Sequence, residues 1–277
     1  MRKVLDAVAV SNTRAVVLGA NRAAILDLTN IASPLLVHVP VGFRPNDVAM
    51  TPDGTLAVIR GGNSSGTVVG GTFVIRMSDG AQLAFHAGAT PLYDYDGTVP
   101  YSFNTDSVAV TDRHAISLSI VPATPFAPAS TRVAIWDLQH LSGTPTVIAE
   151  TGALGGRGDL RGAPHDVAIT SDGTRAIARS ELGIAVWNLN GATATRASGG
   201  GLTGDPGPFS DTAMDSIEVT NELVVTLANV AGVAAPGETQ VEVIDWAGTR
   251  WSGRIPGRPH DLAVTPNGRL ALVRTGA

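Results

Sequence analysis

The chain has 277 residues, no cysteine and a formal net charge of −5, and 44% of its residues are hydrophobic but only 5% aromatic. Without a general positive field, nucleic acid is not expected as a partner, and the lack of cysteine excludes disulfides, thiolate catalysis and cysteine-based zinc sites. No apolar run approaches the ~20 residues of a membrane-spanning helix, which argues against membrane insertion. The 32 glycines and 17 prolines favour short strands joined by turns over long helices.

An internal repeat runs through the whole chain. It consists of a short apolar strand, a tight turn and a second strand, most clearly at residues 45–60, 161–179 and 259–274. Its apolar anchors lie 40 to 60 residues apart, at Val8-Ala9, Val48-Ala49, Val108-Ala109, Val167-Ala168, Ile217-Glu218 and Leu262-Ala263. This spacing is that of a four-stranded propeller blade. We therefore predict an all-β fold with one β-propeller domain over residues 1–277.

The expected blades cover approximately residues 4–42, 43–102, 103–162, 163–210, 211–256 and 257–277, the last only in part. In the second blade, strands a to d are expected at residues 47–50, 56–60, 72–77 and 82–86. Strand c is regular elsewhere, with period-two alternation at 23–27, 132–137, 183–188 and 240–245. The sixth repeat stops after strand b, so either the natural chain continues or the last blade keeps an exposed edge. We favour a longer exported protein, in the bacterial periplasm or at the cell surface.

The turns and strand ends resemble the YVTN-type bacterial β-propeller repeat over essentially the whole chain. The resemblance rests on Pro52-Asp53-Gly54, Ser171-Asp172-Gly173 and Pro266-Asn267-Gly268 between strands a and b, and on Leu26-Asp27 and Ile244-Asp245 at the end of strand c. It implies a β-propeller fold. Members of the family include lactonase-like enzymes, dehydrogenase subunits and surface binding proteins, so the resemblance leaves the activity open.

The blades alternate in kind. The even blades carry Asn46-Asp47, His165-Asp166 and His260-Asp261 before the anchor, whereas the odd blades carry Asp6-Ala7, Asp106-Ser107 and Asp215-Ser216. An alternating pattern closes cleanly only with an even number of blades. We therefore expect a ring of six blades in three paired units, and the rival interpretation is a seven-bladed ring cut short.

The first residue of each of these pairs defines a candidate ring of polar side chains, consisting of Asp6, Asn46, Asp106, His165, Asp215 and His260. If strand a lines the central channel, these six converge at its mouth. Their oxygen and imidazole donors suit a divalent cation such as calcium, or a cationic ligand. Alternatively, they hydrogen-bond the backbone amides of the incoming loops. No redox or nucleotide cofactor is required.

The second residue of each even pair precedes an arginine by thirteen positions, in the pairs Asp47 and Arg60, Asp166 and Arg179, and Asp261 and Arg274. A tight turn between strands a and b places each carboxylate opposite its arginine, and the odd blades lack both partners together. We interpret the three pairs as structural ion pairs. The alternative is that the arginines hold an anionic ligand at the channel.

The longest segments all connect strand b to c or strand d to the next blade, and so fall on one face of the propeller. They cover residues 61–71, 87–105, 121–131, 152–164, 196–213 and 229–239. Long loops on one face indicate a binding face for a protein or a small ligand. With no nucleophile elbow in the sequence, a binding scaffold is favoured over an enzyme. The alternative is a metal-assisted, lactonase-like hydrolase at the channel mouth.

Overall fold

The computed structural model describes residues 8–19, 22–42, 44–62, 71–87, 107–121, 130–141, 147–150, 160–161, 164–180, 183–197, 217–230, 237–265 and 268–276. Within these ranges every regular element is a β-strand. A helix of the length and apolarity needed to cross a membrane is absent from the same ranges. The all-β prediction is therefore confirmed.

The strands form six antiparallel sheets, which we number as blades one to six in chain order. Blade one holds β1 (Val8–Val10), β2 (Arg14–Leu18), β3 (Arg22–Asp27) and β4 (Leu35–Pro40); blade two β5 (Arg44–Met50), β6 (Leu56–Gly62), β7 (Gly71–Arg76) and β8 (Gln82–Ala87); blade three β9 (Val108–Val110), β10 (His114–Val121), β11 (Ser130–Asp137), β12 (Val147–Glu150) and β13 (Leu160–Arg161); blade four β14 (Pro164–Ile169), β15 (Arg175–Ser180), β16 (Gly183–Asn190) and β17 (Thr193–Arg196); blade five β18 (Ile217–Val219), β19 (Leu223–Asn229), β20 (Glu238–Asp245) and β21 (Arg250–Pro256); blade six β22 (Arg258–Val264) and β23 (Ala271–Gly276).

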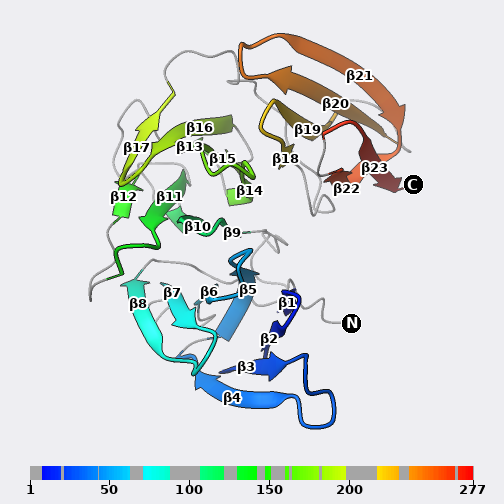
Figure 1. Cartoon of the computed structure of the whole chain (residues 1–277). Coiled ribbons are helices and arrows are strands. Elements are labelled where there is room, and N and C mark those ends of the chain that lie inside the picture. The colour runs from blue at the N-terminus through cyan, green and yellow to red at the C-terminus, as the bar shows by residue number, and fades with distance from the viewer. Residues whose placement is uncertain are drawn as a thin grey trace.

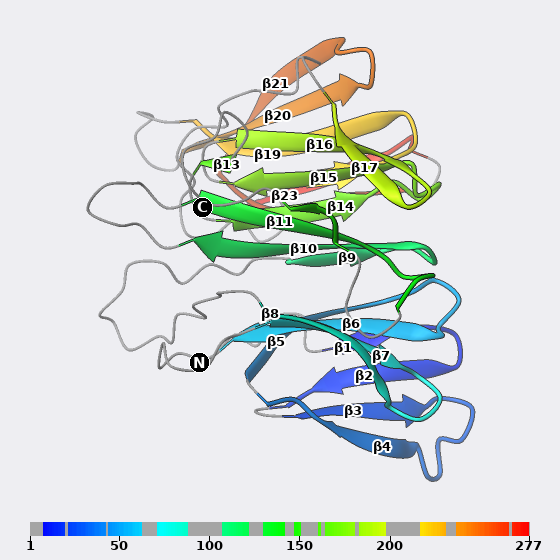
Figure 2. The ribbon, with the colours of Figure 1, turned by 90° about the vertical axis from the view of Figure 1, so that its left-hand side faces the viewer.

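The blades succeed one another around a common centre, with β1, β5, β9, β14, β18 and β22 innermost (Figure 1). Viewed from the side, the strands run in alternating directions and the short hairpin turns gather at one end of the blades (Figure 2). Blade six has only two strands in the described part of the chain. The architecture is that of a β-propeller whose sixth repeat is half present.

The hydrophobic core lies between blades. Because successive side chains of a strand point to opposite faces of its sheet, each inner strand serves both neighbours. In blade two, Val48 packs toward blade one, and Ala49 packs toward blade three. In blade four, Val167 packs toward blade three, and Ala168 packs toward blade five. The period-two pattern of the sequence thus produces a sheet buried on both faces.

Two kinds of turn join the inner strands a and b. In blade two the amide of Thr51 donates to the carbonyl of Leu56 at 3.0 Å, and Gly54 adopts a φ of +70° that favours glycine. In the odd blade one, Ser11 instead closes a shorter turn by accepting the amide of Arg14 at 3.1 Å. Thr111 and Thr220 play the role of Ser11 in blades three and five. The alternation of the sequence is therefore also an alternation of turn geometry.

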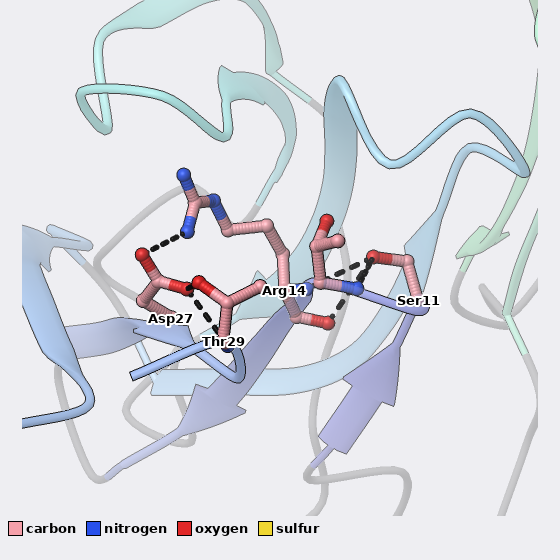
Figure 3. A network of polar contacts seen from close by, with 5 residues as sticks. Ser11, Arg14, Asp27 and Thr29 are labelled. Atoms are coloured by element: carbon pink, nitrogen blue, oxygen red, sulfur yellow. Dashed lines mark hydrogen bonds and ion pairs between the residues drawn. The ribbon is translucent and has the colours of Figure 1, made fainter. Parts of the chain in front are cut away.

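A polar network holds the hairpins of blade one together (Figure 3). The Nη1 of Arg14 lies 2.7 Å from a carboxylate oxygen of Asp27, across strands β2 and β3. The other oxygen of Asp27 accepts both the amide and the hydroxyl of Thr29, at 2.9 and 2.6 Å. The Thr29 hydroxyl and then Arg14 lower the pKa of Asp27 to about 2. The aspartate closing strand c is thus a local anchor for the turn that follows.

Candidate functional site

The candidate site begins with the carboxylate and arginine that the even blades place on their two inner strands. Asp47 is the cross-strand partner of Arg60, and Asp166 is that of Arg179. All four residues are buried, with 0 to 2% of their surface exposed. Burial favours the neutral form of a guanidinium and lowers the pKa of Arg60 to about 10, while the charge of Asp47 opposes this shift. Burial likewise lowers the pKa of Arg179 to about 9, against Asp166, so both arginines are cationic at neutral pH.

Each of these buried carboxylates also reaches the next blade. Oδ2 of Asp47 accepts the amide of Ser107 at 2.5 Å and its hydroxyl at 2.9 Å. Oδ2 of Asp166 accepts the amide of Ile217 at 2.7 Å. Ser107 and Ile217 stand where the chain enters blades three and five, directly after residues 88–106 and 198–216 of the sequence. The aspartates of blades two and four therefore anchor the return of the two longest connectors.

Blade six repeats the arrangement at its surface. Asp261 is the cross-strand partner of Arg274, and Oδ2 of Asp261 lies 3.2 Å from Nη2 of Arg274. The two side chains are 37% and 59% exposed. The same sequence motif thus occurs twice in a buried interface between blades and once in contact with solvent.

A backbone irregularity precedes all three aspartates. The strand register shifts between Pro45 and Asp47, and again at the equivalent places in β14 and β22. Asn46, His165 and His260 are therefore the extra residues of three equivalent β-bulges. A bulge interrupts strand pairing and turns the chain locally, and bulges are frequent beside functional sites. Sequence reasoning did not predict them, although the Pro-x-Asp spacing shared by the three even blades is their signature.

The candidate ring lies largely outside the described part of the chain. Asp6, Asp106 and Asp215 are not among the described residues, and of Asn46, His165 and His260 only the backbone is described. Among the side chains that are described, no three histidines or carboxylates lie together as metal ligands would. The ring thus stays a prediction.

The opposite face is closed by short turns that hydrogen-bond from blade to blade. The amide of Asp53 in blade two donates to Asp112 in blade three at 2.9 Å, and the amide of Asp172 in blade four donates to Asn221 in blade five at 3.1 Å. His114 of blade three contacts the carbonyl of Gly191 in blade four at 2.9 Å. Arg175 lies over the ring of Trp246 in the turn after β20, with its guanidinium carbon 4.4 Å from the ring centroid. These links join the turns of blades two to five to one another.

The loop-rich face is defined less sharply than its sequence suggested. The connectors of residues 88–106 and 198–216 leave the even blades two and four, whereas residues 41–43 join blades one and two directly. Only Gly257 separates β21 of blade five from β22 of blade six. At these four junctions, the connector is therefore long after an even blade and short after an odd blade. Most of the predicted loop residues lie outside the described ranges.

No protein-family model matches the chain, and no curated protein matches it either. Among solved structures, Kuenenia stuttgartiensis hydrazine synthase is similar at 12% identity and a TM-score of 0.59, over 99% of this chain and 75% of that one. A chain of the mitotic checkpoint complex is similar at 12% identity and a TM-score of 0.59, over 100% and 74%. The WD40 β-propeller domain of Doa1 is similar at 11% identity and a TM-score of 0.50, over 97% and 75%. At such identities these likenesses establish the fold alone, and the chain is a β-propeller.

Proposed function

We propose that the chain is a binding scaffold, which presents the long connectors of one face to a protein or a small ligand. The observation that carries this proposal is the pair of anchors Asp47 and Asp166, which hold the ends of the two longest connectors on buried inner strands. Binding residues are disproportionately found on loops that a rigid scaffold positions. The cross-linked turn face supplies the rigidity, and the connectors supply the variable surface.

The similar solved structures fit this proposal only in general terms. One belongs to a hydrazine synthase and another to an assembly, the mitotic checkpoint complex, so the fold itself serves unrelated roles. The resemblance to YVTN-type repeats, whose members include surface binding proteins, favours the scaffold role. We place it in an exported bacterial protein, in the periplasm or at the cell surface.

The test of this proposal replaces residues 198–216 with a Gly-Ser linker of equal length and compares binding to protein and glycan arrays. A ligand that the unaltered chain retains and the linker variant loses supports the scaffold role. The control is a second variant in which Asp112, on the turn face, is changed to alanine, and we expect it to bind normally. Unaltered binding by the linker variant, or the absence of any specific ligand on either array, would contradict the proposal.

A second candidate is a metal-assisted, lactonase-like hydrolase, with a divalent cation held by the ring of Asp6, Asp106, Asp215, Asn46, His165 and His260. The three equivalent bulges favour it, since they set one ring residue of every even blade apart from the regular pairing. Elemental analysis and thermal unfolding, before and after chelation, distinguish the two candidates. A stoichiometric ion that Asp106→Ala with His165→Ala abolishes supports the hydrolase. The absence of any ion, with no shift in Tm on chelation, leaves the scaffold.

A further inference from the structure

The dipeptide Asn-Gly occurs twice in the chain, at Asn190-Gly191 and at Asn267-Gly268. In this dipeptide the backbone nitrogen of the glycine can attack the side-chain amide of the asparagine and close a succinimide ring. Glycine favours the attack because it has no side chain to hinder the approach. In a folded chain the reaction also depends on whether hydrogen bonds hold the two reacting groups.

Asn190 and Gly191 lie at the hairpin turn between β16 and β17, at the end of the blades where the short turns gather (Figure 2). Asn190 pairs with Thr193 across the turn, its side chain is exposed, and Gly191 has a φ of +57°. Within the described ranges, neither the side-chain amide of Asn190 nor the backbone N–H of Gly191 makes a hydrogen bond. Both reacting groups of this dipeptide are therefore available.

The second dipeptide differs at the attacking nitrogen. The N–H of Gly268 donates to the carbonyl of Thr265 at 2.7 Å, and the N–H groups of Gly54 and Gly173 make the equivalent bond at 2.8 Å in the other even blades. Asn267 itself lies outside the described residues. The nitrogen of Gly268 must give up its hydrogen bond before it can attack. The chain thus contains one available and one protected nucleophile in the same dipeptide.

Blade three places a positive charge beside the available dipeptide. A Cβ built on Gly191 would lie 3.2 Å from Nη2 of Arg113, so the guanidinium rests against this glycine. As the ring closes, negative charge develops on the attacking nitrogen and on the side-chain oxygen of Asn190. A fixed cation close to developing negative charge lowers the barrier of a reaction. Arg113 should therefore accelerate ring closure.

The same turn also carries a link between blades three and four. The carbonyl of Gly191 accepts a hydrogen bond from Nε2 of His114 at 2.9 Å, and His114 is 3% exposed. The other ring nitrogen of His114 is buried and has no hydrogen-bond partner in the described part of the chain. A displaced Gly191 carbonyl would leave a buried donor unsatisfied, which lowers stability.

We propose that Asn190 is a site of spontaneous deamidation, and that its product weakens the link between blades three and four. The nitrogen of Gly191 bonds to Cγ of Asn190, the Cγ–Nδ2 bond breaks, and ammonia leaves with the proton of the Gly191 amide. Water then opens the succinimide to aspartate or isoaspartate. Isoaspartate adds one carbon atom to the main chain directly before Gly191, so the carbonyl shifts relative to His114. The inference does not rest on the proposed function.

The rates at the two dipeptides test the chemistry. The full chain is incubated at mildly alkaline pH, both folded and in urea, and peptide mass spectrometry follows deamidation at Asn190 and Asn267. Relative to its rate in urea, folded Asn190 should react faster than folded Asn267 by roughly two- to tenfold, which is the factor that corresponds to the net free energy of one hydrogen bond. Arg113→Gln should slow the reaction at Asn190 severalfold in the folded chain and leave its rate in urea unchanged.

Thermal unfolding tests the effect on the link. Incubation of the unaltered chain should lower its Tm as isoaspartate accumulates at Asn190. Asn190→Gln is the matched control, because glutamine closes a larger ring much more slowly, and its Tm should stay constant over the same time. Asn190→Asp adds the charge without the extra backbone carbon, so it should lower the Tm less than isoaspartate does.

Four results would overturn the inference or a part of it. Equal relative rates at Asn190 and Asn267 in the folded chain would mean that the fold does not select Asn190. An unchanged rate in Arg113→Gln would remove the guanidinium from the chemistry. An equal fall of Tm in Asn190→Gln would place the damage elsewhere. A constant Tm despite complete deamidation at Asn190 would mean that the link through His114 survives.

Discussion

Replacing Asp166 by asparagine should be among the most destabilising conservative changes in the molecule. The substitution keeps the shape of the side chain but removes the charge that faces Arg179, whose surface is 0% exposed. It also weakens two hydrogen bonds, in which the carboxylate accepts the amide of Val167 at 2.6 Å and that of Ile217 at 2.7 Å. Removing one partner of a buried ion pair typically costs about 3–5 kcal/mol. Against a total stability of about 5–15 kcal/mol, this is a large fraction.

The chain contains its own control for this prediction. Asp261 and Arg274 form the same cross-strand pair in blade six, but their side chains are 37% and 59% exposed. Solvent screens an exposed pair, so Asp261→Asn should cost only about 0–1 kcal/mol. The two substitutions are chemically identical, but Asp166 is buried and accepts the amides of Val167 and Ile217, whereas Asp261 lies at the surface.

Urea denaturation followed by tryptophan fluorescence measures both free energies of unfolding. Adding Arg179→Met to Asp166→Asn removes the buried charge that Asp166 balanced, so the double variant should be more stable than the sum of the two single changes predicts. Equal losses for Asp166→Asn and Asp261→Asn, within about 1 kcal/mol, would refute the reasoning, since burial would then have no influence on the pair. Additive single changes would show that the carboxylate acts on the amides alone.

Three further outcomes are expected. The pKa of Asp27 is lowered from its ordinary value of 3.8 to about 2. The ionised Asp27 therefore stabilises the fold fully above pH 3.8, and this stabilisation is lost as the pH falls through 2. Asp27→Asn should flatten the fall of Tm between these two pH values. Gly54→Ala should cost about 1–2 kcal/mol in urea denaturation, since φ is +70° and a Cβ would lie 2.9 Å from the Ser11 hydroxyl. Trp136→Ala should cost about 3–5 kcal/mol, since the side chain is fully buried between blades two and three.

Each of these outcomes has a matched comparison. Asp79 lies at an exposed turn where the amide of Ala81, and then Arg76, also hold its pKa below the usual value, so Asp79→Asn should flatten the fall of Tm as well; the absence of any flattening in both variants would contradict the assignment to local hydrogen bonds. Gly173→Ala has a similar φ of +68° but its nearest neighbour is 3.5 Å away, so it should cost less than Gly54→Ala. Trp251→Ala, 61% exposed, should change stability far less than Trp136→Ala. Equal costs in either comparison would mean that packing is not the cause.

The all-β repeat and the pairing partners of the even blades could be predicted because both depend only on the spacing of residues along a short stretch of the chain. A tight turn between two strands sets their register, so a separation of thirteen positions from Asp47 to Arg60 already places the two opposite each other. The bulge at Asn46 could not be predicted with the same ease. The extra residue precedes Asp47, on the side of the pair away from the turn. It therefore changes neither the register near the turn nor the spacing between Asp47 and Arg60.

What the sequence determined by itself was the blade, since alternation, turn residues and strand length are properties of neighbouring residues along the chain. What only the tertiary structure decided was which faces of the blades are covered. Asp166 and Asp261 stand in the same local sequence, yet one is buried against Ile217 of the next blade and the other lies at the surface. Burial sets the electrostatic and packing energies of a site, and it depends on contacts between segments far apart in sequence. Local pattern therefore predicts the pair, and the arrangement of the blades determines what the pair does.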